Sequence, residues 1–307
     1  MALDEGSSPA GPDPGHRGGD VAGEDADRAE VEVQEWRPWA PRRRAPLDTA
    51  LGRRLTAELR QWPDFIIIGA QRAGTTSLYR FLMGHPRATA ARLKELHYFD
   101  KLYRRGHRWY RSNFPLRRAG QVTGEATPYM LFHPLCPGRS AADLPATTRF
   151  IALLRDPVQR ALSHYWLNVN RGVESESFAD AMAAEAERLA GTEDVVRRGE
   201  NSFNHQTYSY AARGRYAEQL ARWFEAVGRD RVLVLQSETL FASVDAGDEV
   251  LRWLRLEPQH RSFPKANGAR RKGEVSEAEV AAVRRRFASA NRDLEELVGR
   301  PFWPGGD

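Results

Sequence analysis

The chain has 307 residues, of which 41% are hydrophobic and 28% are charged, and these values are typical of a soluble globular protein. The formal net charge of +5 suits an anionic ligand, but without a basic helix interleaved with aromatic residues it does not indicate a nucleic-acid partner. The single cysteine, Cys136, excludes a disulfide within the chain, and no apolar run approaches the roughly 20 residues of a transmembrane segment.

Residues 1–60 are predicted to form a disordered or extended N-terminal arm. Residues 1–30 are rich in Gly, Pro, Asp, Glu and Ala and carry almost no large apolar side chains, a composition that cannot build a core. Residues 35–46 add two tryptophans and a basic cluster, and they either dock on the folded domain or form a solvated tail. Because the N-terminus lacks the basic start and apolar stretch of a secretory signal, we expect a cytoplasmic location.

A single folded domain is expected from residue 61 to residue 307, with strands and helices in alternation. Short apolar runs rich in β-branched residues predict buried strands at 65–68, 149–155 and 231–238. Helical patterns cover residues 75–85, 158–170, 215–228, 248–256 and 276–287. This alternation predicts one α/β domain around a mostly parallel sheet, whereas the span 170–214 is helical in its middle and otherwise ambiguous.

Two of these helices have recognisable first turns. Pro157 stands just after the second strand, where a proline suits the first turn of a helix. Ser276 and Glu279 have the spacing of a capping box and predict the start of the last helix.

The junction between the first strand and its helix, residues 69–77, has the layout of an anion-binding site. A helix start leaves its first N–H groups without partners, and the helix dipole adds positive potential there. Gly69 and Gly74 let the backbone approach an anion closely, and Arg72 contributes a charged fork. The residues predicted to hold the anion are Gln71, Arg72, Ala73, Gly74, Thr75, Thr76 and Ser77.

The spacing of the two glycines matches the Walker A frame, but the lysine of that frame is absent. Thr75 stands where the lysine is required, and the cation comes two residues before Gly74. The loop alone therefore leaves two interpretations open, a site for a nucleoside phosphate and a tight turn without a ligand.

The stretch "GAQRAGTTSLY" resembles the 5′-phosphosulfate loop of sulfotransferases that use 3′-phosphoadenosine 5′-phosphosulfate (PAPS). A second stretch, "LLRDPVQRALSHYW" (153–166), resembles the 3′-phosphate motif of the same family and supplies Arg155 and Ser163. An arginine at the carboxyl end of a strand faces the crevice where open α/β sheets bind ligands. Taken alone, Arg155 could equally form a structural salt bridge, and Ser163 could be an ordinary helix serine.

A third stretch, "KELHYFDKLYRRGHRWYRSNFP" (94–115), resembles the heparan sulfate N- and 3-O-sulfotransferases. The resemblance continues through "GEATPYML" (124–131), "GRYAEQLARWF" (214–224) and "KANGARRKG" (265–273). It implies a P-loop-like domain whose central, mostly parallel sheet is flanked by helices. It also implies PAPS as the sulfate donor and adenosine 3′,5′-bisphosphate (PAP) as the product. The last stretch either folds over the nucleotide or is a solvated basic turn, and its residues are Gly268, Arg270, Arg271, Lys272 and Gly273.

The same resemblance implies roles for three side chains. Glu95 matches the catalytic carboxylate, which would take the proton of the acceptor. His97 lies two residues on, and in an extended segment both would face one side, so that His97 could assist or orient Glu95. Arg72 would neutralise charge that grows on the bridging oxygen and the 5′-phosphate. The family commonly has lysine there, and an arginine is poorly suited to donate a proton to the leaving group. Without the family, a surface glutamate and a packed histidine are the simpler interpretations.

One departure from the family concerns the acceptor. Several heparan sulfate enzymes have a lysine after the glutamate of "GEATP", and here that position is Ala126. Lys94 or Lys101 would have to take over any task of that lysine. We therefore expect transfer of a sulfuryl group to a hydroxyl or amine of a saccharide-, glycolipid- or metabolite-type acceptor, and we leave the acceptor itself open.

No metal is expected to take part, because a sulfuryl group carries less charge than a phosphoryl group and the sequence has no ligand-spaced Cys and His residues. Two alternatives belong to other classes. A P-loop kinase or NTPase would need a lysine after Gly74 and an acidic Mg²⁺ ligand, for which Asp156 is a weak candidate. A non-catalytic nucleotide- or glycan-binding module would keep the fold without the chemistry.

Overall fold

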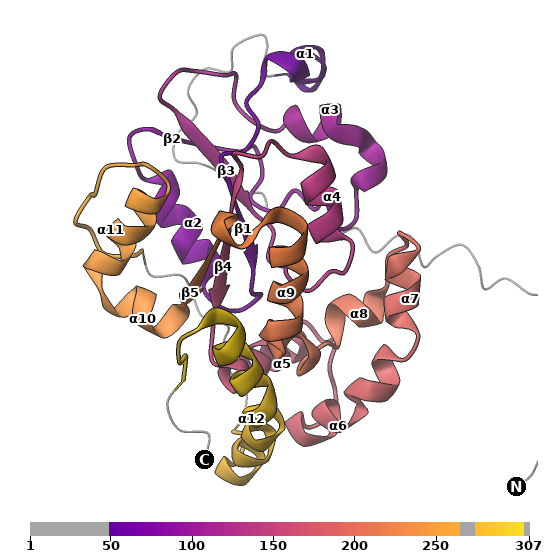
Figure 1. The fold of residues 1–307 in the computed structure, drawn as a ribbon. Coiled ribbons are helices and arrows are strands. Elements are labelled where there is room, and N and C mark those ends of the chain that lie inside the picture. Colours follow the sequence, from indigo (N-terminus) through magenta and orange to yellow (C-terminus); the bar gives the residue numbers. More distant parts are fainter. Residues whose placement is uncertain (1–48, 265–273, 304–307) are drawn as a thin grey trace, which may run out of the picture. The chain divides into compact units, whose positions relative to one another are not determined.

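The computed structural model describes residues 49–264 and 274–303, and its centre is a parallel sheet (Figure 1). In the described residues this sheet has five strands in the order β2–β3–β1–β4–β5, and every neighbouring pair is parallel. The strands are β1 (Phe65–Gly69), β2 (Ala88–Ala90), β3 (Val122–Ala126), β4 (Arg149–Leu154) and β5 (Val232–Gln236). The expected P-loop-like α/β domain is confirmed.

Helices cover both faces of the sheet. Helices α2 (Thr75–Met83), α10 (Ser237–Ala242) and α11 (Val244–Trp253) lie on one side, and α4 (Cys136–Asp143) and α9 (Tyr216–Val227) lie on the other (Figure 1). The remaining helices of the described residues are α1 (Ala50–Leu55), α3 (Gly106–Arg111), α5 (Pro157–Asn170), α6 (Phe178–Leu189), α7 (Thr192–Arg197), α8 (Phe203–Thr207) and α12 (Glu277–Val298). Short 3-10 turns occur at Ala57–Leu59, Tyr103–Arg105, Ala212–Gly214 and Arg229–Arg231.

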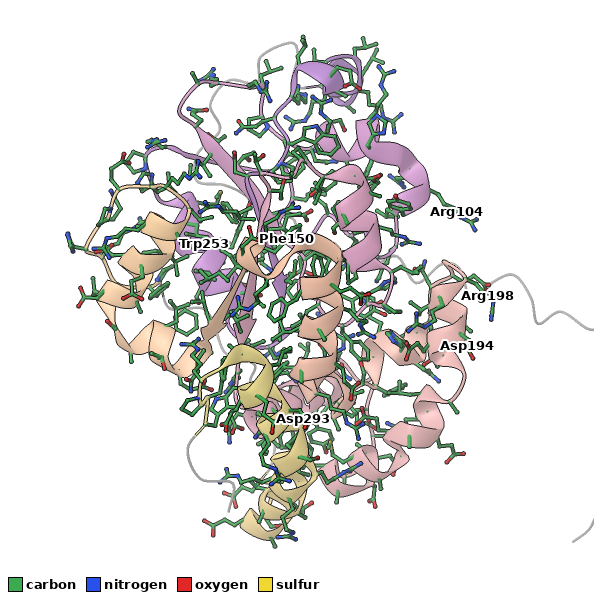
Figure 2. The ribbon with its side chains drawn as sticks, in the orientation of Figure 1. Arg104, Phe150, Asp194, Arg198, Trp253 and Asp293 are labelled. Carbon is green, nitrogen blue, oxygen red and sulfur yellow. The ribbon has the colours of Figure 1, made fainter. Side chains whose placement is uncertain are left out.

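The main hydrophobic core lies against the central strands, and β1 is buried along its whole length. Phe150 of β4 packs against Trp223 of α9, with ring centroids 5.0 Å apart. Figure 2 shows Phe150 at the centre of the fold, whereas the side chains of Arg104 and Arg198 project outward. Strands buried on both faces have apolar side chains in every position, which explains why β1 and β4 were visible in the sequence.

The predicted element starts agree with the structure at several points. Asp156 caps helix α5 by accepting the N–H of Gln159, and Pro157 is the first helical residue. Ser276 and Glu279 form the predicted capping box of α12, which runs on to Val298. The third predicted strand ends earlier than residue 238, because helix α10 begins at the residue after β5.

The chain is helical where the sequence analysis expected an arm up to residue 60. Residues 50–59 form α1 and a 3-10 turn, and the hydroxyl of Thr49 accepts the N–H of Gly52 at the helix start. Arg53 donates to the carbonyl of Ser112 at 2.7 Å, and the buried Arg60 donates to that of Phe114 at 2.8 Å. These bonds tie residues 50–60 to the chain that follows α3.

The predictions for residues 1–30 and 35–46 lie outside the described residues. Within 49–264 and 274–303, no helix combines the length and the apolarity that crossing a membrane requires.

Candidate active site

The loop between β1 and α2 forms a turn that leaves the start of a helix open. Arg72 and Gly74 both have left-handed backbone conformations, with φ of 72° and 95°. Gly74 is the N-cap residue of α2, and no side chain caps this helix start. A Cβ at Gly74 would lie 2.5 Å from the ring of Phe241, so glycine suits this position both conformationally and sterically. The first N–H groups of α2 are thus available to an anion.

The predicted loop residues are held by contacts from distant parts of the chain. Ser237 donates its hydroxyl to the carbonyl of Ala73 at 2.8 Å, and Arg213 donates to the side-chain oxygen of Gln71 at 2.5 Å. Thr75 and Ser77 are buried in the first turn of α2, and Thr76 between them is half-buried. The loop is therefore fixed before any ligand arrives.

The two predicted phosphate motifs meet at Arg72. Its Nε donates to the hydroxyl of Ser163 at 3.0 Å, and the guanidinium of Arg155 donates to the Arg72 carbonyl at 3.1 Å. The hydroxyl of Tyr216 donates to the carbonyl of Arg155 at 2.8 Å and so fixes the end of β4. Because β1 and β4 are parallel neighbours, their carboxyl ends lie at one edge of the sheet, which brings residues 72, 155 and 163 together.

The charge at this edge is positive, and the described residues provide no counterion for it. Burial, together with the charges of Arg155, Arg171 and Arg160, lowers the pKa of Arg72. In the described part of the chain, neither Arg72 nor Arg155 forms an ion pair with a carboxylate. Like charges held close together repel one another, and a bound anion relieves that repulsion. The edge therefore favours an anionic ligand.

A second cluster surrounds Glu95, in the loop that follows β2. One carboxylate oxygen of Glu95 lies 2.5 Å from Lys94 Nζ, and the other lies 3.5 Å from His97 Nε2. The other ring nitrogen of His97 lies 2.6 Å from a carboxylate oxygen of the buried Asp100. The predicted proximity of Glu95 and His97 is confirmed. The prediction that they lie in an extended segment is wrong, since His97 has φ of 51° in a loop without strand structure.

The charges in this cluster follow from its contacts. Burial alone would raise the pKa of Glu95, but the hydrogen bond from His97 and the charge of Lys94 lower this pKa to about 2. Burial alone would lower the pKa of His97, but the charge of Asp100 and the hydrogen bonds to Asp100 and Glu95 raise this pKa to about 9. At neutral pH Glu95 is ionised and His97 is protonated, so Glu95 is the member of the pair that can accept a proton.

Sequence reasoning missed Arg213, which lies between the two clusters. This arginine is buried, with its guanidinium 4.7 Å from the ring centroid of Tyr129, and it donates to Gln71 in the phosphate loop. Burial lowers the pKa of Arg213 to about 10, and the charge of Asp100 acts in the opposite direction. A lone arginine in a loop carries no pattern, although Arg213 directly precedes the quoted stretch 214–224.

Asp100 was also missed as a site residue, although it stands inside the quoted stretch 94–115. The predicted nucleotide-covering residues Gly268, Arg270, Arg271, Lys272 and Gly273 lie outside the described residues.

The chain is similar to known proteins in sequence and in fold. Residues 63–146 match a model of the sulfotransferase family. The chain is 31% identical over 222 residues to heparan sulfate glucosamine 3-O-sulfotransferase 3B1 of Mus musculus, in an alignment that covers 72% of this chain and 52% of that protein. It is 30% identical over 275 residues to the 3A1 enzyme of the same species, with 80% and 65% covered.

The chain thus spans between about half and two-thirds of the length of these relatives. Among solved structures, a sulfotransferase from Alicyclobacillus acidocaldarius matches with a TM-score of 0.62 and 26% identity. That match covers 79% of this chain and 98% of the other.

Proposed function

Because the chain belongs to the sulfotransferase family, we propose that it transfers a sulfuryl group from PAPS to a hydroxyl of a saccharide acceptor. The observation that carries this proposal is the meeting of Arg72, Arg155 and Ser163 at one edge of the sheet. Two segments distant in sequence build a cationic site there, and PAPS is a ligand with anionic groups at both its 5′ and 3′ positions.

The two halves of the cationic site suit the two ends of the donor. The open N–H groups of α2, with the hydroxyls of Thr75 and Thr76, would hold the 5′-phosphosulfate. Arg155 and Ser163 would hold the 3′-phosphate, since a guanidinium binds phosphate oxygens in a bidentate fashion. An anion would relieve the repulsion between the arginines. Within the described residues, neither Arg72 nor Arg155 has an ion pair that binding would have to break.

The chemistry assigned to Glu95 is general base catalysis. Glu95 takes the proton of the acceptor hydroxyl while the hydroxyl oxygen forms a bond to sulfur. The bond between sulfur and the bridging oxygen breaks, and its electron pair leaves with PAP. Arg72 stabilises the charge on that oxygen without giving up a proton, because an arginine stays protonated in proteins.

The resting contacts of Glu95 indicate how the base becomes active. With a pKa of about 2, the carboxylate beside Lys94 and His97 is ionised but weakly basic. An acceptor hydroxyl that replaces Lys94 would remove a stabilising charge, and exclusion of water would raise the pKa of Glu95 further. His97, protonated and held by Asp100, would keep the second carboxylate oxygen in place.

The proposed acceptor class is supported by the relatives and by two lysines near the base. The relatives named above act on the glucosamine of heparan sulfate, and we propose a glucosamine-containing oligosaccharide as the first acceptor class. Ala126 is fully buried in β3 and carries no charge, whereas Lys94 Nζ lies 2.5 Å from a carboxylate oxygen of Glu95. Lys101 interacts electrostatically with Asp100 and Glu95, so that two lysines can meet an anionic sugar.

The test uses sulfur-labelled PAPS with a panel of glucosamine oligosaccharides, glycolipids and phenols, in the presence of EDTA. We expect label transfer to an oligosaccharide, and we expect Glu95→Gln to lower kcat by about 10²- to 10⁴-fold while the Kd for PAP is unchanged. Glu249→Gln, at an exposed position on α11, is the matched control and should behave as the wild type.

Three outcomes would contradict the assignment. Transfer that survives Glu95→Gln unchanged would remove Glu95 as the base. PAP binding without transfer to any acceptor would favour a non-catalytic module. ATP turnover that requires Mg²⁺ would favour a kinase, although Asp156 already serves as a helix cap. Metal independence and cytoplasmic location stay predictions, and the EDTA arm tests the first.

A further inference from the structure

Strand β3 carries a buried carboxylate, Glu125, directly beneath the segment that bears Glu95. Glu125 is 1% exposed. Its Oε1 accepts the hydroxyl of Tyr110 at 2.5 Å, and its Oε2 accepts the hydroxyl of Thr127 at 2.8 Å and the N–H of Leu96 at 3.4 Å. All three partners are donors, so the arrangement suits an ionised carboxylate.

The bond to Leu96 has a counterpart on the other side of Glu95. The N–H of Ala126 donates to the carbonyl of Lys94 at 3.1 Å. Two successive residues of β3 therefore hold the residues on either side of Glu95, one through the backbone and one through the Glu125 side chain. The backbone bond alone would let the segment pivot about residue 94, and the carboxylate supplies a second point of attachment.

Glu125 also supports the far side of His97. The ring of Tyr110 stacks on that of Tyr98, with centroids 4.7 Å apart and planes inclined by 20°. Tyr98 directly follows His97, whose left-handed backbone conformation, with φ of 51°, is unfavourable for a residue with a Cβ. Contacts on both sides of His97 are needed to maintain such a conformation, and Glu125 contributes to each of them, through Leu96 and through Tyr110.

The burial of this carboxylate is costly. Burial and, to a smaller extent, the charge of Asp100 raise the pKa of Glu125 to about 7, against the hydrogen bonds from Tyr110, Thr127 and Leu96. Within the described residues no cation is paired with Glu125. A buried carboxylate without an ion pair is a poor means of stabilising a fold, which favours a task in the site.

We propose that Glu125 is a positioning residue that fixes the Glu95 carboxylate through the Leu96 amide and through the stack of Tyr110 on Tyr98. Its effect on catalysis rests on the function proposed for Glu95. Its effect on the geometry of the loop does not depend on that function and can be measured without an acceptor.

The test compares Glu125→Ala with Glu125→Gln, whose side-chain oxygen can still accept the Leu96 N–H. The control is Glu174→Ala, because Glu174 is also buried and accepts a tyrosine hydroxyl and backbone N–H groups, and it differs from Glu125 in that it forms an ion pair with Arg188. The measurements are hydrogen–deuterium exchange of the Leu96 amide, the pKa of His97 by NMR, the melting temperature, and kcat and KM for PAPS.

We expect Glu125→Ala to speed exchange at Leu96 by at least about tenfold, because its N–H loses the carboxylate that accepts it. The pKa of His97 should fall from about 9, because its contact with Glu95 loosens. The value of kcat should fall by about 10- to 100-fold with KM for PAPS little changed. Glu125→Gln should restore the Leu96 exchange and most of kcat, and Glu174→Ala should lower the melting temperature alone.

The proposal is overturned if folded Glu125→Ala leaves the Leu96 exchange and the His97 pKa as they were, or if Glu174→Ala changes them equally. If Glu125→Ala does not fold, Tyr110→Phe decides, since it keeps the stacked ring and loses only the bond to Glu125. Its kcat should then fall with an unchanged KM for PAPS, and an unaltered kcat overturns the proposal. If the loop responds but no form of the protein transfers sulfate, the positioning role stands and the proposed function fails.

Discussion

The proton on His97 decides which residue of the Glu95–His97 pair can act as a base. The two residues are near in sequence, but the sequence does not show the burial and the neighbouring charges that determine their protonation states. The charge of Asp100 keeps His97 protonated, because the buried Asp100 carboxylate lies 2.6 Å from His97 Nδ1 and accepts a hydrogen bond from it. A protonated His97 holds Glu95 in place and leaves proton transfer to the carboxylate.

A charged His97 predicts a pH-dependent contribution to stability. Its folded-state pKa of about 9 exceeds the ordinary value of 6.5, so its stabilising effect is complete below about pH 6.5 and is lost as the pH rises through 9. We expect His97→Gln to lower the free energy of unfolding by about 1–3 kcal/mol at pH 6 and by much less at pH 10. Urea unfolding at the two pH values measures this, with the exposed His107→Gln as control. An equal loss at both values would show that His97 is neutral when folded.

At the scale of elements, the strands that the sequence predicted were those with apolar runs, namely β1, β4 and β5. Strand β3 was not predicted, because it contains Gly124 and Glu125 instead of an apolar run. It forms because β1 and β2 pair with it on either side, and a Cβ at Gly124 would lie 2.6 Å from the backbone of Phe65. The propensity of one segment does not show which strands pair with it, so the contact of Glu125 with the Leu96 N–H was not predictable either.

The start of α2 yields a prediction about the phosphate loop as an element. Gly74→Ala should weaken PAP binding at least about tenfold, because alanine at φ of 95° is strained by about 1–3 kcal/mol and its Cβ would displace Phe241. Isothermal titration with PAP measures this. Gly138→Ala is the control, since Gly138 lies in α4 and a Cβ there meets no atom within 4 Å. Unchanged PAP affinity in Gly74→Ala would remove the helix start from the nucleotide site.

Over the whole described molecule, the sequence predicted several residues of the candidate site, but it did not predict all of the contacts between them. Motif order predicted Arg72, Arg155 and Ser163 as one group, and the fold brings together residues 91 positions apart. The bond from Arg213 to Gln71 joins residues 142 positions apart and belongs to no motif. Only the folded sheet defines which loops share its edge, and this is why the second contact could not be foreseen.

A site assembled from such distant segments predicts that its ligand stabilises the entire fold. PAP at 100 times its Kd should raise the free energy of unfolding by about 2.7 kcal/mol. For a domain of this size, that gain corresponds to a melting temperature about 5–10 °C higher, given about 2–4 °C per kcal/mol.

Adenosine 5′-monophosphate at equal concentration should stabilise less, because it lacks the 3′-phosphate. In Arg155→Ala the advantage of PAP should disappear, while Arg198→Ala, at an exposed residue, should retain it. Thermal unfolding with each nucleotide, with and without EDTA, measures these shifts. Equal stabilisation by both nucleotides in the wild type would place the 3′-phosphate away from Arg155, and a shift that needs Mg²⁺ would contradict the metal-free site.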